Sequence, residues 1–185
     1  KQAQKDGYRS RAAYKLLEID ERDRILKPDM LVIDLGAAPG SWSQVARQKL
    51  KNTGNVIALD ILEMTPLPAV KFIHGDFREE TIAAEIQKHF NNRRPDLVMS
   101  DMSPNMSGIV ISDQANSMHL AELALAFSID HLNYGGNFLV KTFQGRDFDQ
   151  FLRAMRSSFK QVVIRKPKAS RDRSNELYLL GIGKK

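Results

Sequence analysis

An apolar run over residues 30–35 stops at a glycine, and it restricts the possible folds more than any other feature. The run reads Met-Leu-Val-Ile-Asp-Leu, and Gly36 follows it. A strand with almost no polar side chain is typical of the middle of a parallel sheet, where helices cover both faces. The run therefore predicts an α/β protein.

Strand and helix patterns alternate along most of the chain. Further strands are expected at residues 55–60, 70–74, 96–100 and 137–143, and helices at 41–51, 81–90 and 113–132. Ser10 can cap an earlier helix, which carries Lys15 and ends before Pro28. This alternation predicts a doubly wound, Rossmann-like parallel sheet.

The end of the chain breaks the alternation. Apolar segments at 162–164 and 177–180 are separated by a basic loop that leaves no room for a helix. Parallel strands need a long crossover, whereas antiparallel strands can be joined by a loop. The last two strands are therefore expected to pair as a terminal antiparallel hairpin.

Length and composition limit the organisation of the chain. A length of 185 residues is about that of one domain, so residues 1–185 are expected to form a single domain. No apolar run approaches the ~20 residues that cross a bilayer, and the first residues do not form a secretory signal. We expect a cytoplasmic monomer without membrane contact, or an organellar protein if a transit segment precedes Lys1. Cysteine is absent and the four histidines are scattered, which excludes disulfides and a cysteine nucleophile, and no metal site is expected.

Positive charge is concentrated in two segments. Residues 1–15 hold five basic residues against one acidic residue, and residues 160–173 hold six against one, within a net charge of +6. A solvated terminus and loop would show such charge, but two local concentrations favour a face that binds phosphates. The residues expected to contact RNA are Arg9, Arg11, Lys166, Lys168, Arg171 and Arg173.

The segment Asp-Leu-Gly-Ala-Ala-Pro-Gly at 34–40 ends the first sheet strand and opens a helix. Doubly wound sheets bind ligands at this place, and Gly36 and Gly40 let the backbone approach them closely. Ala38 stands where the dinucleotide fingerprint GxGxxG needs its second glycine. The loop therefore favours an adenosine ligand without a pyrophosphate over NAD.

Acidic residues follow the next three strands at the same edge. Asp60 can accept both ribose hydroxyls or cap its own turn. Asp76 and Phe77 can receive the adenine amino group and ring face, or Asp76 can cap a helix that starts near Arg78. Asp101 opens Asp-Met-Ser-Pro-Asn, which is not the Asn/Asp-Pro-Pro-aromatic motif associated with methylation of base amines. An oxygen is therefore the expected acceptor of any methyl group.

Lys141 interrupts the apolar strand at 137–143. Burying an unpaired ammonium is costly, so lysines in such places are usually paired, functional or both. Glu176 begins the last strand after the basic loop, where a glutamate is usually solvated.

Six motifs, taken in order, resemble the FtsJ/RrmJ family of ribosomal RNA 2′-O-methyltransferases. They are SRAAYKL around Lys15, DLGAAPGSWSQ, GDF at Asp76, SDMSPNMSG at Asp101, VKTFQG at Lys141 and RSNELY at Glu176. The resemblance covers nearly the whole chain. The sequence differs from the family pattern at Ser41, where close relatives usually have glycine.

The resemblance implies a seven-stranded methyltransferase sheet and the cofactor S-adenosylmethionine. The expected cofactor contacts are Gly36, Gly40, Trp42, Asp60, Asp76, Phe77 and Asp101, and the expected catalytic tetrad is Lys15, Asp101, Lys141 and Glu176. Trp42 can instead act as a packing aromatic whose backbone alone touches the cofactor. Glu176 is expected to be the more exposed and less important tetrad member.

The implied reaction is attack of a ribose O2′ on the methyl group of the sulfonium. The implied substrate is a uridine of large-subunit ribosomal RNA in an assembled particle, with transfer RNA or an mRNA cap ribose as alternatives. Lys141 either removes the hydroxyl proton as a general base or stays charged and orients the hydroxyl. A small-molecule O-methyltransferase would need neither the basic segments nor the tetrad, and a non-enzymatic RNA-binding module would need no cofactor loop.

Overall fold

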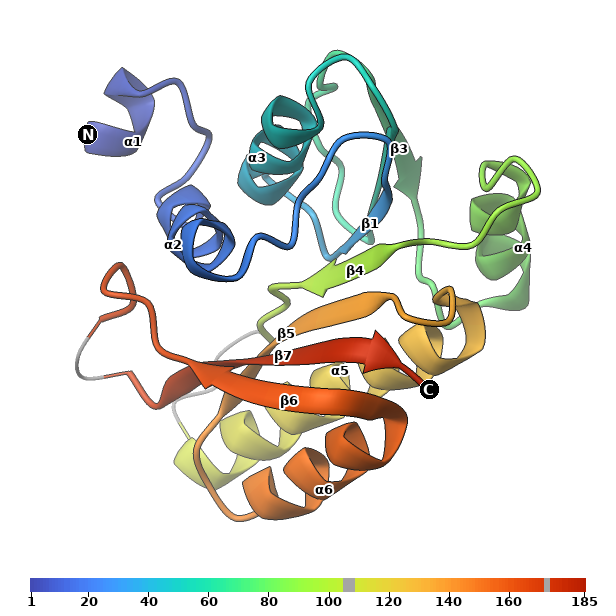
Figure 1. Ribbon diagram of the computed structural model, residues 1–185. Coiled ribbons are helices and arrows are strands. Elements are labelled where there is room, and N and C mark those ends of the chain that lie inside the picture. Colours follow the sequence, from blue (N-terminus) through green and yellow to red (C-terminus); the bar gives the residue numbers. More distant parts are fainter. Residues whose placement is uncertain (105–108, 172–173) are drawn as a thin grey trace.

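The computed structural model describes residues 1–104, 109–171 and 174–185. Seven strands of this described part form one sheet, in the order β3-β2-β1-β4-β5-β7-β6 (Figure 1). The strands are β1 (Leu31–Leu35), β2 (Asn55–Asp60), β3 (Val70–His74), β4 (Leu97–Ser100), β5 (Asn137–Phe143), β6 (Phe159–Arg165) and β7 (Glu176–Lys184). The helices are α1 (Gln2–Lys5), α2 (Ala13–Asp23), α3 (Ser41–Leu50), α4 (Glu80–Lys88), α5 (Val110–His131) and α6 (Phe148–Ser158).

Strand β1 lies in the interior of the sheet. All five of its residues are buried, and its neighbours β2 and β4 run parallel to it. Ile33 is in register with Ile57 of β2 and Val98 of β4. The strands β1 to β5 are all parallel, as the apolar run and the alternating pattern predicted.

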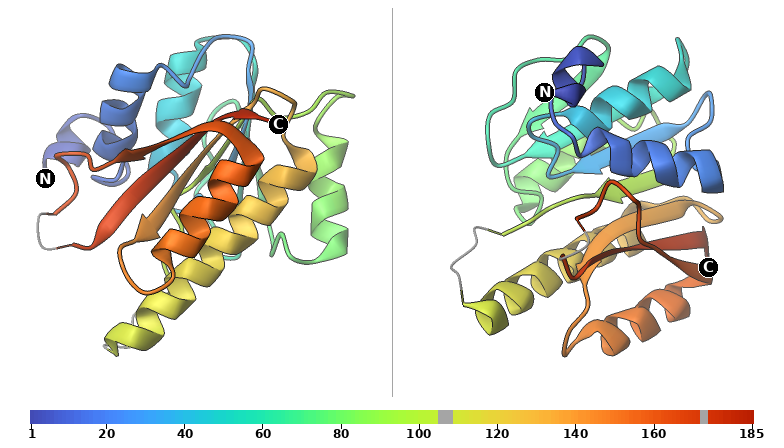
Figure 2. Two further views of the ribbon diagram at one scale, coloured as in Figure 1. Left: turned by 60° about the horizontal axis from the view of Figure 1, so that its bottom comes forward. Right: turned by 90° about the vertical axis from the view of Figure 1, so that its left-hand side faces the viewer.

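Helices cover both faces of the sheet. Figures 1 and 2 show α2 and α3 on one face and α5 and α6 on the other. Alternate residues of β1 accordingly enter two different cores. Ile33 and Leu35 pack with residues of α5 and α6, whereas Val32 packs with residues of α2 and α3. The doubly wound α/β fold is thus confirmed, and its parallel strands end together at one edge, where such sheets bind ligands.

Strand β7 runs antiparallel to both of its neighbours, β5 and β6. Val163 lies opposite Leu180, so the predicted terminal hairpin is confirmed. On its other side β7 pairs with β5, and Lys141 lies opposite Tyr178. The reversed strand therefore places its first residues beside the carboxyl end of β5.

The start of α2 differs from the expectation. The helix begins at Ala13 and has no side-chain cap, so the predicted Ser10 cap is wrong. Ser10 Oγ instead shares a hydrogen bond of 2.8 Å with Ser41 Oγ, at the start of α3. Helix α6 was not predicted from the sequence; its buried residues Phe151, Leu152 and Met155 anchor it to the sheet. None of the helices in the described ranges is both long and apolar enough to cross a membrane.

Two polar contacts hold α2 on the sheet and on the hairpin loop. Arg165 of β6 donates hydrogen bonds of 2.8 Å to both carboxylate oxygens of Asp23. Glu18 accepts hydrogen bonds from the backbone N–H groups of Lys168 and Ala169. Helix α2, which carries Lys15, is therefore fixed to the β6–β7 hairpin at two points.

Candidate active site

The pairing of β5 with β7 places several functional side chains on one face of the sheet. Lys141 lies opposite Tyr178, and Phe143 lies opposite Glu176. Residues directly opposite in an antiparallel pair project to the same face, and so do residues two apart on one strand. Tyr178 packs in the core that α2 and α3 cover. All four side chains therefore belong to the α2 side of the sheet.

Helix α2 and the end of β4 supply the other two members of the predicted tetrad. Lys15 Nζ donates hydrogen bonds of 3.0 and 2.9 Å to the two oxygens of Glu176. Lys141 Nζ lies 3.2 Å from Asp101 Oδ1 and 3.5 Å from Glu176 Oε1. The four residues thus form one chain of contacts in the order Lys15, Glu176, Lys141, Asp101.

Charge in this cluster is balanced, with two ammonium groups against two carboxylates. Burial alone would raise the pKa of Glu176, but the hydrogen bonds from Lys15 and the charge of Lys141 outweigh it, and the net shift is downward. Burial raises the pKa of Asp101, and the charge of Lys141 and the hydroxyl of Tyr178 oppose that rise. Glu176 is only 5% exposed, so the expectation of a solvated, more exposed glutamate is wrong.

Tyr178 is a member of the cluster that was not anticipated. Its hydroxyl donates a hydrogen bond of 2.6 Å to Asp101 Oδ1 and lies 3.4 Å from Glu176 Oε1. Burial, together with these two carboxylates, raises its pKa well above the usual value, so the hydroxyl stays protonated and can donate. Its ring centroid lies 5.7 Å from that of Trp42. The position two residues after Glu176 on a strand was the available signal, since such residues share a face.

A pocket of about 500 Å³ lies at the carboxyl ends of β1 to β4. Its lining includes Gly36, Asp60, Asp76, Phe77, Asp101, Met102 and Ser103. Gly36 has a φ of 71°, and a Cβ there would lie 2.1 Å from Met102 Cγ. The loop therefore needs glycine at this position both for its conformation and for its packing.

Asp60 holds backbone groups of its own turn and of the glycine loop, and its contact with a ribose stays a prediction. Its carboxylate accepts backbone hydrogen bonds of 2.8 Å from Ala38 and 2.9 Å from Leu62, so it organises the glycine loop and its own turn. It also lines the pocket. A carboxylate oxygen has room for a second donor, so these contacts leave acceptor capacity for a ligand.

Asp76 and Phe77 also line the pocket, but Asp76 already has a partner. Arg78 Nε donates hydrogen bonds of 2.9 Å to both oxygens of Asp76, and these bonds lower its pKa. The alternative of Asp76 as a helix cap is wrong, because α4 begins at Glu80 and Glu79 is its cap residue.

Two predicted cofactor residues are not among the described residues that line this pocket. Trp42 is 3% exposed, and its Nε1 donates a hydrogen bond of 2.8 Å to the carbonyl of Ala12. Its side chain therefore packs α3 against the segment before α2. Gly40 has a φ of 116° and is the cap residue before α3, where a Cβ would lie 3.0 Å from Met64 Sδ.

A second pocket, of about 370 Å³, opens beside the charged cluster. The described residues that line it are Ser10, Arg11, Ala12, Lys15, Ser103, Lys141, Phe143, Ala169, Arg171, Ser174 and Glu176. Ser103 lines both pockets, and its Oγ accepts a hydrogen bond of 2.8 Å from Lys141 Nζ. The cluster therefore stands where the two pockets meet.

The six basic residues expected to contact RNA differ in their hydrogen-bond partners and in their exposure. Arg9 donates to the carbonyls of Pro39, Thr65 and Pro66, and Lys166 donates to the carbonyls of Ser174 and Glu176, so both hold loops together. Arg11 and Arg171 line the second pocket and are exposed, and Lys168 is exposed on the hairpin loop. Arg173 lies outside the described residues.

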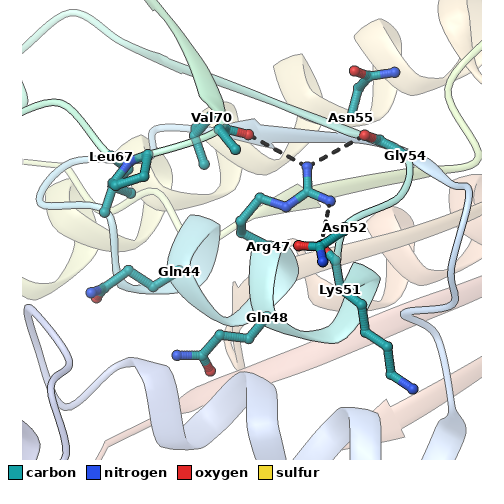
Figure 3. A pocket seen from close by; sticks show the side chains of 11 residues that line it. Gln44, Arg47, Gln48, Lys51, Asn52, Gly54, Asn55, Leu67 and Val70 are labelled. Carbon is teal, nitrogen blue, oxygen red and sulfur yellow. Dashed lines mark hydrogen bonds between the residues drawn. The ribbon is translucent and has the colours of Figure 1, made fainter.

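A cavity larger than these two pockets lies away from the cluster (Figure 3). It has a volume of about 820 Å³ and lies between α3 and the segments that start β2 and β3, at the opposite edge of the sheet. Arg47, in its lining, donates to the carbonyls of Lys51, Thr53, Gly54 and Ala69. Arg47 therefore connects α3 to the neighbouring loops. Because its guanidinium is already used in these contacts, we do not take this cavity as the candidate active site, although it is larger.

Comparisons with known proteins place the chain among relatives of one kind. Residues 8–184 match the family of FtsJ-like methyltransferases. A protein named ribosomal RNA large subunit methyltransferase E, from Nitrosospira multiformis, is 62% identical over 185 residues, which cover 100% of this chain and 90% of the relative. The protein of that name from Methylobacillus flagellatus is 62% identical over 98% of this chain and 88% of the relative. A solved structure from Plasmodium falciparum, described as a ribosomal RNA methyltransferase, has a TM-score of 0.86 at 31% identity and covers 96% of this chain and 98% of its own.

Asp34 is a further buried acid beside the cluster. It is 1% exposed and lines a small cavity with Asp101, between the glycine loop and Trp42. Burial raises the pKa of Asp34 to about 7; a hydrogen bond of 2.7 Å from Ser43 opposes the rise, and the charges of Asp101 and Asp60 add to it.

This shift predicts a pH-dependent stability. The folded-state pKa lies above the ordinary value of 3.8, so the contribution of protonated Asp34 is full at low pH and is lost as pH rises toward 7. The unfolding free energy of the wild type minus that of Asp34→Asn is expected to fall by up to about 1.4 kcal/mol per unit between about pH 4 and 7, and then to level off.

Urea denaturation between pH 5 and 8.5 measures this difference. Asp149→Asn, which removes an exposed carboxylate from α6, is the matched control. A difference that does not change with pH for Asp34→Asn would show that the carboxyl does not titrate in this range.

Proposed function

Since the chain belongs to the FtsJ-like methyltransferase family, we propose that it transfers a methyl group from S-adenosylmethionine to a ribose 2′-hydroxyl of large-subunit ribosomal RNA. The proposed acceptor is a uridine in an assembled particle. The names of the two relatives above support ribosomal RNA as the substrate. Residues 1–185 would perform this reaction as a single domain.

The observation that carries the proposal is the contact chain of Lys15, Glu176, Lys141 and Asp101 at the junction of two pockets. One pocket would hold the methyl donor and the other the acceptor ribose. A small-molecule O-methyltransferase has no need for two lysines, or for Arg11 and Arg171 around the second pocket. A non-enzymatic RNA-binding module has no need for the first pocket.

The first pocket fits adenosine in chemistry and size. Its carboxylates, at Asp60, Asp76 and Asp101, can accept hydrogen bonds from hydroxyl and amino groups. Among the described residues that line this pocket, the basic side chains are those of Arg78 and His119. Arg78 is already paired with Asp76, so the pocket offers little to a phosphate. A volume of about 500 Å³ suits a ligand of this size.

When bound, S-adenosylmethionine would supply an electrophilic methyl group on a positively charged sulfur. Lys141 would hold the acceptor hydroxyl by exchanging its hydrogen bond to Ser103 for one to O2′, because Ser103 lies between the pockets. O2′ would then form a bond to the methyl carbon as the carbon–sulfur bond breaks. The hydroxyl proton would pass to Asp101, whose pKa burial raises.

This scheme assigns Lys141 an orienting role in preference to that of a general base. Carboxylate oxygens of Asp101 and Glu176 lie within 3.5 Å of its Nζ and stabilise the charged ammonium. Lys15 and Glu176 would act as positioning residues, since Lys15 contacts Glu176 and Glu176 contacts Lys141. Alignment of this kind is a large source of rate enhancement.

Asp60→Ala is expected to weaken binding of S-adenosylmethionine. Each hydrogen bond lost to a charged acceptor is worth about 1.5–3 kcal/mol, less what water recovers. Isothermal titration calorimetry measures the change, with Asp149→Ala on α6 as the control and circular dichroism as a check of the fold. Equal affinities for the wild type and Asp60→Ala would remove Asp60 from the cofactor site.

Lys141→Ala is expected to lower single-turnover methyl transfer by about 10²-fold or more, because a misplacement of the reacting atoms by about 1 Å alone costs this much. Lys141→Arg keeps the charge but cannot deprotonate, so it should retain more activity than Lys141→Ala. The assay uses labelled S-adenosylmethionine and large-subunit particles from cells that lack the enzyme. Cofactor affinity should not change in either variant, and a near-normal rate for a folded Lys141→Ala protein would refute the mechanism.

Arg171→Ala is expected to reduce the salt dependence of RNA binding. Each phosphate contact contributes about 0.7 to the slope of log K against log salt for a single strand. Filter binding at several salt concentrations gives this slope. Arg153→Ala, on α6 and across the sheet from the second pocket, should leave it unchanged. An unchanged slope for Arg171→Ala would show that Arg171 contacts no phosphate and that the hairpin loop is only solvated.

A further inference from the structure

Phe143 differs from the other phenylalanines in where its ring lies. Among the described residues, each of the other eight belongs to one of the three apolar clusters or packs against one. Phe143 does neither, and it is only partly buried. A large apolar ring that stabilises no core is available for another contact.

The ring lies in the second pocket, next to the group that would act on the acceptor. Phe143 is two residues after Lys141 on β5 and therefore points to the same face of the sheet, at a spacing of about 7 Å along the strand. It lies opposite Glu176 in the register with β7. Phe143, Lys141 and Glu176 all line this pocket.

Two exposed arginines also line this pocket. Arg11 comes from the segment before α2, and Arg171 comes from the loop between β6 and β7. Guanidinium groups can hold phosphates, and aromatic rings can stack on bases. Together they are the usual means by which proteins bind unpaired nucleotides.

We propose that Phe143 is a stacking platform for the base of the acceptor nucleotide, which therefore enters the site unpaired. This inference rests on the proposed function. C2′, which carries the acceptor oxygen, is bonded directly to C1′, which carries the base, so a hydroxyl held at Lys141 brings its own base within reach of the next side chain on the same face. Phe143 would be a positioning residue for O2′.

The proposal distinguishes two ways of presenting a ribose. A double-stranded RNA displays its 2′-hydroxyls in a wide and shallow minor groove, and an enzyme could reach them there without touching a base face. A stacking ring requires that the base leave its helix or come from a single-stranded segment. Every base has such a face, so Phe143 selects for an unpaired nucleotide and contributes little to the choice among bases.

Three variants test the platform: Phe143→Leu, Phe143→Tyr and Phe143→Trp. The measurement is kcat/KM for methyl transfer to large-subunit particles from cells that lack the enzyme. Phe143→Leu is expected to lower kcat/KM by about 5- to 150-fold, the range that loss of one base stack produces. The two aromatic variants should retain most of the wild-type value. Phe148→Leu, which replaces a half-buried ring at the first position of α6 that packs on the core, is the matched control.

The outcomes separate this inference from the proposed function. If the wild type transfers no methyl group to the particles, the proposed function fails. If the wild type is active and Phe143→Leu equals it, or if Phe143→Tyr and Phe143→Trp are as impaired as Phe143→Leu, the stacking platform is refuted. Calorimetry with S-adenosylmethionine and thermal unfolding should give wild-type values for Phe143→Leu, and a loss in either would assign the ring a structural role instead.

Discussion

The ammonium of Lys141 lies inside a sheet, and such a charge can be buried only where opposite charges compensate it. The compensation comes from Asp101 at the end of β4 and from Glu176 at the start of β7. Glu176 in turn compensates Lys15 from α2. The reversed last strand, the docking of α2 and the packing of Tyr178 beneath the acids are therefore linked, because each helps to place one partner of the same charged cluster.

The direction of the strands explains why two pockets meet at this cluster. Parallel strands β1 to β4 end at one edge and leave the first pocket there. The antiparallel β7 begins at that edge, where β5 ends, and brings the hairpin loop beside α2 to form the second pocket. A purely parallel sheet would have placed the start of its last strand at the far edge, without Glu176 or the basic loop.

Most of the sheet could be predicted from the sequence, because buried parallel strands are continuous apolar runs with clear ends. The bounds of β2, β3 and β5 match the expectation. Predictions that depended on the partner of a single side chain were less reliable. Ser10 pairs with Ser41 instead of capping a helix, and Glu176 is buried because Lys15 lies 161 positions away in sequence but adjacent in space. Tyr178 was missed for the same reason, since its partner Asp101 is distant in the sequence.

The β6–β7 hairpin restricts the order in which parts of the chain can fold. Strand β6 hydrogen-bonds to β7 and, in the described sheet, to no other strand, so it has no place in the sheet until β7 is present. Glu176 of β7 and Lys15 of α2 lie 161 positions apart, and contacts this distant in sequence form late, because a long loop must close first. The described lining of the first pocket ends at Leu123, whereas that of the second pocket includes Arg171, Ser174 and Glu176, so the second pocket would be completed later in folding. The charged cluster would therefore be assembled only when the hairpin docks against β5 and α2, so a partly folded protein would lack the second pocket and be inactive.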